Sequence, residues 1–262
     1  MINLFSRYLR VLSTAVSFTV FMIWGSSLGV IFFPVLKLFI KNRVSRRKFF
    51  IHHMGWVWRV FIRMMEILRA FKKIEIKGLE NFEQNRASLV IANHLTLVDI
   101  VAFGSKIENF NCVVKESLWK QPFFGSVVKA CDFIPNTGGE EFIELCKRGF
   151  KEERPLVIFP QGSRTAPDMP ITFQRGVSQI AARIDVPIVP VIITSTPLTL
   201  FKGVPWYKVP AKAPVLTLDI QKPLKIPGEI ASIESMPKKV RAINRFLEDY
   251  YKRNRLRITQ KN

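Results

Sequence analysis

The stretch LVIANHLTLVD, residues 89–99, says more about this chain than any other segment of its length. Residues 89–92 are wholly apolar, and a short apolar run of this kind is typical of a buried strand. An amide, an imidazole and a carboxylate follow, at Asn93, His94 and Asp99. The stretch therefore predicts a buried strand with His94 and Asp99 just beyond its carboxyl end.

A histidine and an aspartate at this spacing suit general-base catalysis. Imidazole, with an ordinary pKa of about 6.5, can accept a proton from a hydroxyl, and a carboxylate on its other ring nitrogen stabilises the imidazolium that forms. Such a pair activates an alcohol to attack a thioester without an enzyme nucleophile. Ser105, Ser126 and Ser163 each follow a glycine, but none lies in the G-x-S-x-G turn of serine hydrolases. The alternative is a capped helix start with Asp99 in its first turn.

Three further blocks follow in order, VVKESLW at 113–119, FPQGSRT at 159–165 and VPIVPV at 186–191. With these blocks, residues 74–200 resemble the PlsC-like glycerophospholipid (1-acylglycerol-3-phosphate) acyltransferase family. Members transfer a fatty acyl group from a carrier thioester to a lysophospholipid or a related acceptor. Two shorter segments, FQRG at 173–176 and KGVPWY at 202–207, are similar to acyltransferases of bacterial aryl-polyene-type lipid clusters.

The resemblance implies roles for five residues. His94 matches the general base of the family's H-x-x-x-x-D pair, and Asp99 matches its orienting carboxylate. In the second block of the family, the glycine lets the backbone approach the acceptor and the arginine holds a phosphate, which here are Gly162 and Arg164. Lys115 is the expected second cation, since cationic side chains bind phosphate oxygens strongly. The alternatives are a solvated loop charge for Arg164 and a surface position for Lys115.

Two departures from the family pattern lie in the expected acceptor pocket. Gln161 replaces the usual glutamate, which removes a charge and keeps a hydrogen-bonding amide. Asn136 stands where many relatives carry an arginine. Both changes make the pocket more neutral, so the acceptor need not be lysophosphatidic acid. Ser163, between Gly162 and Arg164, completes the candidate substrate-binding residues.

The composition predicts a membrane-bound protein. The formal net charge is +20, and 48% of the residues are hydrophobic. Residues 11–36 contain no charged side chain, which is enough to cross a hydrocarbon core that needs about 20 residues. Cations are more numerous after this run than before it, so the positive-inside rule places the following domain in the cytoplasm, on a bacterial-type inner membrane. Because the cations flank apolar segments, membrane lipids are the expected partners, and nucleic acid is not.

Residues 49–73 alternate aromatic and basic side chains, as an amphipathic helix in the membrane interface would. This helix and the first would form an N-terminal membrane-associated helical hairpin. The alternative is a second helix packed on the soluble domain.

The rest of the chain alternates apolar runs with amphipathic stretches, which predicts an α/β fold with a mostly parallel sheet flanked by helices. Ligands of such sheets bind beyond the carboxyl ends of the strands. The expected domains are residues 1–73 for the membrane part, 74–230 for the acyltransferase part and 231–262 for a basic helix. Strands are expected at 74–77, 88–93, 112–115, 156–159, 188–194 and 215–221, and helices at 100–105, 123–130, 140–151 and 174–184.

The basic tail, residues 237–262, is either a solvated helix or a second contact with anionic lipid head groups, and an acidic acyl-carrier protein would be attracted to the same charge. Three cysteines without a C-x-x-C pair fit a reducing cytosol. No metal-ligand or nucleotide-binding pattern is present, so no metal and no cofactor are expected beyond acyl-CoA or acyl-carrier protein as co-substrate.

Together these features predict a membrane-bound O-acyltransferase of phospholipid biosynthesis, with His94 and Asp99 as its general-base pair. The alternatives are an acyltransferase with a lipid acceptor other than lysophosphatidate, and a non-catalytic lipid-binding or scaffold protein of the same fold.

Overall fold

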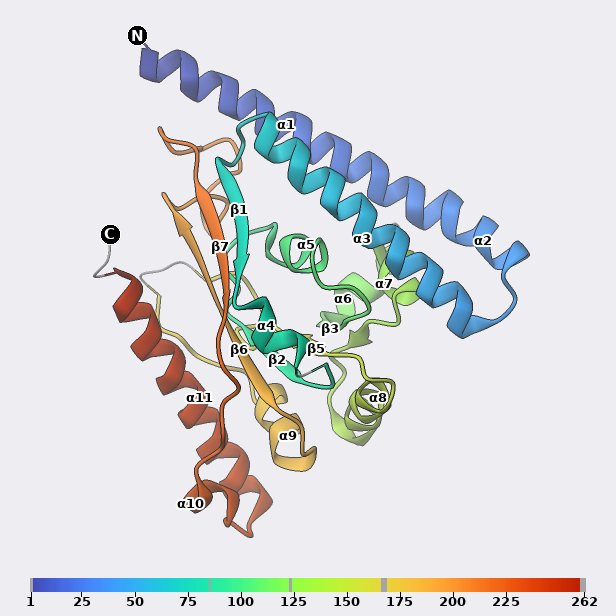
Figure 1. Ribbon diagram of the computed structural model, residues 1–262, viewed down its shortest axis with the longest axis vertical. Coiled ribbons are helices and arrows are strands. Elements are labelled where there is room, and N and C mark those ends of the chain that lie inside the picture. The colour runs from blue at the N-terminus through green and yellow to red at the C-terminus, as the bar shows by residue number, and fades with distance from the viewer. Residues whose placement is uncertain (1, 85, 123, 166–168, 260–262) are drawn as a thin grey trace.

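The computed structural model describes residues 2–84, 86–122, 124–165 and 169–259. Seven strands form one sheet in the order β1-β7-β6-β2-β5-β3-β4 (Figure 1). All neighbouring pairs are parallel except β6 and β7, so the predicted mostly parallel sheet is confirmed. The strands are β1 Lys73–Lys77, β2 Leu89–Ala92, β3 Asn111–Val114, β4 Ile134–Pro135, β5 Leu156–Ile158, β6 Ile188–Thr196 and β7 Val215–Ile220.

The central strand β2 is buried on both faces, as its unbroken apolar run predicts. Because side chains alternate along a strand, Val90 and Ala92 enter one apolar core and Leu89 and Ile91 enter the other. The first core is covered by α3 Arg43–Ile67, α4 Leu79–Glu83, α5 Asp99–Gly104, α6 Glu116–Trp119 and α7 Phe124–Ala130, and the second by α8 Gly139–Lys151, α9 Gly176–Arg183, α10 Gly228–Ala231 and α11 Met236–Thr259.

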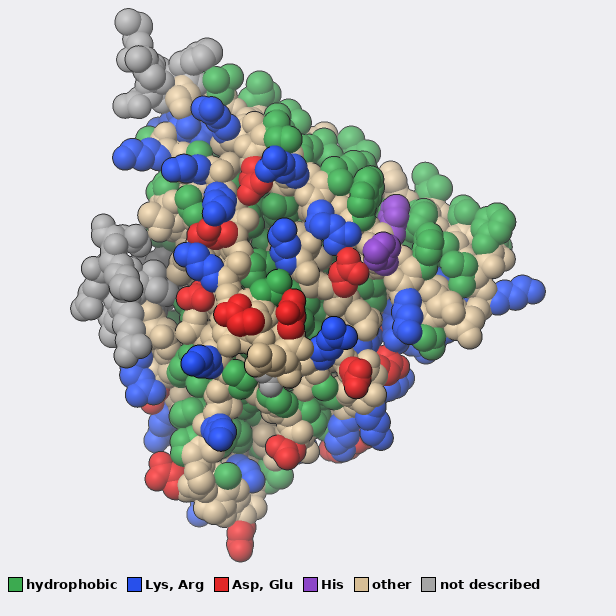
Figure 2. All heavy atoms as spheres, in the orientation of Figure 1, with side chains coloured by type: hydrophobic (Ala, Val, Ile, Leu, Met, Phe, Trp, Pro, Cys, Tyr) green, Lys and Arg blue, Asp and Glu red, His purple; other side chains and the backbone are tan. Residues whose placement is uncertain are grey.

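A helical hairpin lies across the first face of the sheet (Figure 1). Its first arm consists of α1 Ile2–Ser27, a π-helical segment Leu28–Phe32 and α2 Phe33–Phe39, and α3 is its second arm. Within this arm, Ser6–Phe39 is long and apolar enough to cross a membrane, judged by length and composition. Figure 2 shows hydrophobic side chains gathered along the outer edge of the hairpin. The large exposed ones on α1 are Tyr8, Leu9, Leu12, Val16, Met22 and Ile23.

The second arm differs from the amphipathic interface helix expected at residues 49–73. Helix α3 begins six residues earlier, where Asn42 caps it by accepting a hydrogen bond from the N–H of Ser45 at 3.0 Å. It ends before Arg69, whose left-handed backbone (φ 58°) cannot continue a helix. Phe50, Phe61 and other side chains along one side of α3 are buried in the first core. One side of α3 therefore packs on the α/β domain, as the alternative expected, while large apolar side chains on its other side are exposed, and its place in a membrane interface stays a prediction.

The C-terminal helix α11 packs on the opposite face of the sheet. Val240, Ile243, Leu247 and Tyr251 recur at helical spacing and are buried in the second core. This stripe fixes one side of α11 and leaves its cations outside. The exposed cations are Lys238, Arg241, Arg245, Lys252 and Arg253, and residues 260–262 of the expected tail lie outside the described part of the chain.

Several bounds differ from those expected. Asn93 lies just beyond β2, yet its side chain extends the pairing with β6 by donating to the carbonyl of Ile193 at 2.9 Å and accepting from the N–H of Ile193 at 2.7 Å. Lys115 and Phe159 likewise fall just beyond β3 and β5. The expected helix at 123–130 is α7, whose expected first residue, Phe123, is outside the described residues.

Candidate active site

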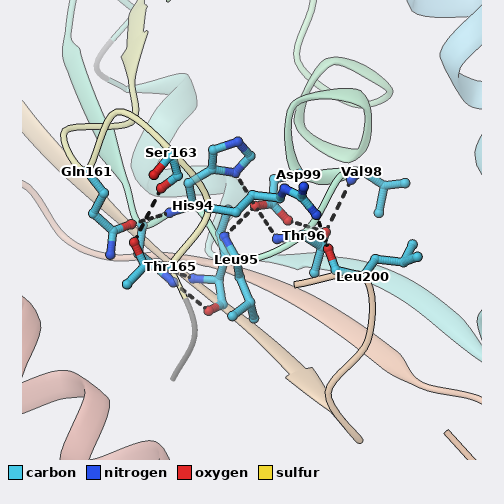
Figure 3. A network of polar contacts seen from close by, with 12 residues as sticks. His94, Leu95, Thr96, Val98, Asp99, Gln161, Ser163, Thr165 and Leu200 are labelled. Atoms are coloured by element: carbon cyan, nitrogen blue, oxygen red, sulfur yellow. Dashed lines mark hydrogen bonds and ion pairs between the residues drawn. The ribbon is translucent and has the colours of Figure 1, made fainter. Parts of the chain in front are cut away.

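His94 and Asp99 are in direct contact. His94 follows β2, and Asp99 is the first residue of α5, so the turn between them brings the two side chains face to face (Figure 3). The Nδ1 of His94 lies 2.8 Å from Oδ2 of Asp99. One quarter of the His94 side chain is exposed, whereas Asp99 is fully buried. The outer edge of the imidazole is therefore accessible, while its Nδ1 is held by Asp99.

Asp99 is fixed by more than the imidazole. Its Oδ2 accepts hydrogen bonds from the backbone N–H groups of Leu95 at 2.7 Å and Thr96 at 2.9 Å. Its Oδ1 accepts from the hydroxyl of Thr96 at 2.5 Å. These donors satisfy the oxygens of the buried carboxylate and fix its position, and the carboxylate in turn orients the imidazole. The sequence indicated the pair but not these supporting donors.

The loop 159–165, after β5, holds the backbone of His94 from the other side. The amide oxygen of Gln161 accepts from the N–H of His94 at 2.7 Å, and the N–H of Thr165 donates to the carbonyl of His94 at 2.9 Å (Figure 3). The ring of Phe159 lies 4.6 Å from the imidazole, centre to centre. Gln161 does not line the cavity described below, so it contacts the base rather than a ligand there.

Gly162 allows this loop its shape. Its φ of 67° is left-handed, and a Cβ there would lie 2.5 Å from Nε2 of Gln174. A side chain at this position would therefore be strained and would collide with a neighbour. The N–H of Gly162 donates to the carbonyl of Phe159 at 3.0 Å, so this donor is occupied within the loop.

Arg164 and Ser163 are held by a second loop, between β6 and β7. One Nη of Arg164 donates to the carbonyl of Leu200 at 2.7 Å. The ammonium of Lys202 lies 3.3 Å from the hydroxyl of Ser163. These two contacts could not be predicted from the sequence, because the partners from the β6–β7 loop are almost forty residues away in the chain.

One cavity of about 670 Å³ joins these groups. His94, Lys115, Asn136, Gly162, Ser163 and Arg164 all line it, and Lys202 and Gln174 join them. Six of the eight residues that the sequence proposed thus meet at one place, with Asp99 buried behind His94. Three cations and no carboxylate are found among the described lining residues, so this end of the cavity attracts anions.

The remainder of the cavity is apolar. It runs beneath the helical hairpin, whose Trp24, Met54 and Trp58 line it together with Cys131 and Phe133 from the α/β domain. A long hydrocarbon chain fits such a lining. Burial raises the pKa of the two lining thiols, Cys112 and Cys131, to about 12, so at neutral pH they are protonated apolar groups rather than nucleophiles. Within the described residues, no three His, Cys, Asp or Glu side chains lie together as metal ligands would.

Fold and site define an α/β protein with a histidine–aspartate pair beyond its parallel strands, at the cationic end of a largely apolar cavity. Residues 73–194 match the family described as Acyltransferase. This match includes all four blocks on which the predicted resemblance rests, so the central part of the chain is similar to that family.

Curated relatives are 1-acyl-sn-glycerol-3-phosphate acyltransferases. The one from Saccharomyces cerevisiae is 29% identical over 55% of this chain and 50% of its own length. Those from Cocos nucifera and Helicobacter pylori are 32% and 26% identical, over 50% and 57% of this chain and 44% and 65% of theirs. The chain therefore spans about half to two thirds of these relatives.

A solved structure shares the fold along nearly the whole chain. It is the 1-acyl-sn-glycerophosphate (LPA) acyltransferase PlsC from Thermotoga maritima, with a TM-score of 0.63 and 20% identity over 95% of this chain and 98% of that one. The likeness includes the helical hairpin, because it extends far beyond residues 73–194.

Proposed function

We propose that this protein is a membrane-bound O-acyltransferase. It moves a fatty acyl group from an acyl thioester to the hydroxyl of a lysophospholipid such as 1-acyl-sn-glycerol-3-phosphate. The observation that carries the proposal is the His94–Asp99 pair at the junction between the cationic end and the apolar part of one cavity. The names of the relatives support the same acceptor class.

The reaction follows from the position of the imidazole. Because Nδ1 of His94 is held by Asp99, Nε2 is the nitrogen that accepts the proton of the acceptor hydroxyl. The acceptor oxygen then attacks the thioester carbonyl, the C–S bond breaks, and the imidazolium returns its proton to the thiolate leaving group. Asp99 stabilises the imidazolium between these two steps.

Substrate binding follows from the two ends of the cavity. Arg164 and Lys115 hold the anionic head of the acceptor, and Asn136 and Ser163 add neutral hydrogen-bonding groups. The acyl chain occupies the apolar part beneath the hairpin. Acyl-CoA and acyl-carrier protein both present the required thioester, and each is a suitable donor. The apolar segment Ser6–Phe39 anchors the protein in an inner membrane, with the site on the cytoplasmic side where these donors occur.

The test is acyl transfer by the purified protein in detergent. Long-chain acyl-CoA and acyl-carrier protein are offered with a panel of lysolipids, and free thiol and new ester are measured together. The proposal expects equal amounts of both, with transfer to a phosphate-headed acceptor and loss of both in His94→Ala. Transfer only to other acceptors would change the acceptor class. Binding of lysolipid without turnover would favour a non-catalytic lipid-binding protein.

A further inference from the structure

The loop of residues 197–214, between β6 and β7, touches both the candidate active site and the first membrane helix. Thr199, Leu200 and Val209 are buried and fix its two ends, while residues 205–208 at its tip are exposed. Leu200 has a left-handed φ of 52°, and Gly203 has a φ of 86°, so the chain turns sharply on both sides of Lys202. The loop is therefore an arm with buried anchor residues and an exposed tip, and Lys202 lies between two sharp turns shortly before the tip.

Two contacts join the arm to the site. The carbonyl of Leu200 accepts from one guanidinium nitrogen of Arg164 at 2.7 Å. Within the described residues Arg164 forms no other hydrogen bond, so the rest of its fork can bind a ligand. Lys202 contacts the neutral hydroxyl of Ser163 at 3.3 Å and lines the cavity beside His94. Among the ion pairs that the described residues form, none includes Lys202. The ammonium of Lys202 is thus available to bind an anion in the cavity.

Two other contacts join the arm to α1. Arg10 is almost wholly buried, and its guanidinium donates to the carbonyl of Pro210 at 3.1 Å and to that of Ala211. The ring of Phe18, two turns further along α1, lies edge-on to that of Trp206 with the centres 6.2 Å apart. A buried arginine that binds backbone carbonyls fixes the position of the segment that carries them.

We propose that the β6–β7 arm is part of the acceptor site, with Lys202 as a specificity-determining residue that binds the acceptor's anionic head together with Arg164. Arg10 is a positioning residue that holds the arm against α1. The proposal rests on the proposed function for the identity of the ligand. A phosphate held between a guanidinium and an ammonium from different loops is bound only when both loops are in place, so the site prefers phosphate-headed lipids to neutral ones.

The test compares two acceptors, a lysophosphatidic acid and a monoacylglycerol, in wild type, Lys202→Ala and Lys208→Ala. Lys208 is the matched control, since it is an exposed lysine of the same arm that does not line the cavity. Lys202→Ala is expected to raise KM for the phosphate-headed acceptor about tenfold, as loss of a charged hydrogen bond would, with kcat little changed. KM for the monoacylglycerol is expected to stay the same in Lys202→Ala. Lys208→Ala is expected to leave KM for both acceptors unchanged. Equal effects on both acceptors, or from both lysines, would overturn the proposal.

Arg10 is tested by a double-mutant cycle. Arg10→Ala is expected to raise the same KM, and the effect is expected to be much smaller when Lys202 is already alanine, because both act through one arm. Additive effects would contradict a positioning role. If the wild type transfers acyl groups to neither acceptor, the proposed function fails. Calorimetric titration with lysophosphatidic acid then still tests whether Lys202 of the arm binds the phosphate head. Equal affinity of wild type and Lys202→Ala for lysophosphatidic acid would then overturn the proposed role of the arm.

Discussion

The two ends of the cavity are built in different ways. At the polar end, His94, Gln161 and Arg164 come from two short loops that follow neighbouring parallel strands, and Asp99 begins the helix after the first loop. Hydrogen bonds fix each of these residues. The lining of the apolar end consists mostly of side chains of the hairpin, α5, α6 and α7, which meet by packing. Under the proposed function, the polar end would determine which bond is made, and the apolar end would determine which acyl-chain length is accepted.

The largest effect is expected at the polar end, from Asp99→Asn. The asparagine would point an N–H₂ group at donors that Asp99 now accepts from, and the imidazole would lose its tautomer control. By analogy with the serine-protease triad, kcat is expected to fall by about 10³ to 10⁴. The free energy of unfolding is expected to fall by about 1–3 kcal/mol. Thiol release measures kcat, and urea denaturation measures the free energy of unfolding. A variant with turnover within tenfold of wild type would contradict the account.

The next effect concerns the apolar end. Phe133 lines the main cavity and also a small neighbouring one, so Phe133→Ala is expected to enlarge the main cavity toward its neighbour. The acyl-length optimum is expected to move to longer chains, with each additional buried methylene adding about 0.8 kcal/mol, or roughly fourfold in kcat/KM. Competition among acyl thioesters of increasing length measures the optimum.

A matched control separates this shift from general damage. Phe142 is equally buried but belongs to the second core and does not line the cavity. Phe142→Ala and Phe133→Ala are each expected to cost about 3–5 kcal/mol of stability. A shift of the length optimum in both variants would show that loosening of the fold, rather than cavity shape, sets chain length.

A smaller effect is expected from Gln161→Leu, which removes the acceptor for the His94 N–H. Loss of that hydrogen bond is expected to cost about 1–2 kcal/mol of stability and to lower kcat by roughly tenfold, because the base is less well positioned. Since Gln161 does not line the cavity, KM for the acceptor is expected to stay unchanged. A change in KM alone would return Gln161 to the acceptor-specificity role that its sequence position suggested. Gln161→Glu, which keeps an acceptor oxygen, is expected to retain activity.

The smallest effect tests how the apolar end is held together. Asp132, between Cys131 and Phe133, accepts hydrogen bonds from Arg43 and Arg47 of α3 at 2.9 and 3.1 Å. Burial alone would raise the pKa of Asp132, but these two arginines lower it below its ordinary value. A lowered pKa in the folded state means that the stabilisation is present above the ordinary pKa, about 4, and is lost as the pH falls through the folded value.

Asp132→Asn is therefore expected to lower stability by roughly 1–2 kcal/mol at pH 7, with the difference from wild type shrinking below about pH 4. Thermal unfolding between pH 7 and pH 3 measures this. Because the ion pairs attach α3 at the apolar end, the variant is expected to show smaller differences in kcat/KM between acyl-chain lengths and a nearly unchanged kcat. A difference from wild type that grows on acidification would contradict the assigned sign.

The polar end of the cavity could largely be predicted from the sequence, whereas the apolar end could not. His94, Gly162 and Arg164 stand in contiguous blocks directly after apolar runs, so their convergence followed from the rule that parallel strands end at one edge of the sheet. The contact of Gln161 with the backbone of His94 could not be predicted, because family position indicates a neighbourhood and not the direction of a side chain. Trp24 and Phe133 could not be assigned to the cavity either, since their meeting depends on how the hairpin packs. Arg10 looked like one more flanking cation.

The most direct test of the division between the two ends is the acyl-length profile of kcat/KM in wild type, His94→Ala and Phe133→Ala. The account predicts that His94→Ala falls by about 10² to 10⁴ at every chain length, as loss of a general base would cause. It predicts that Phe133→Ala keeps its turnover and moves its optimum to longer chains. Turnover of His94→Ala near the wild-type level, or an unmoved optimum in a folded Phe133→Ala, would contradict it.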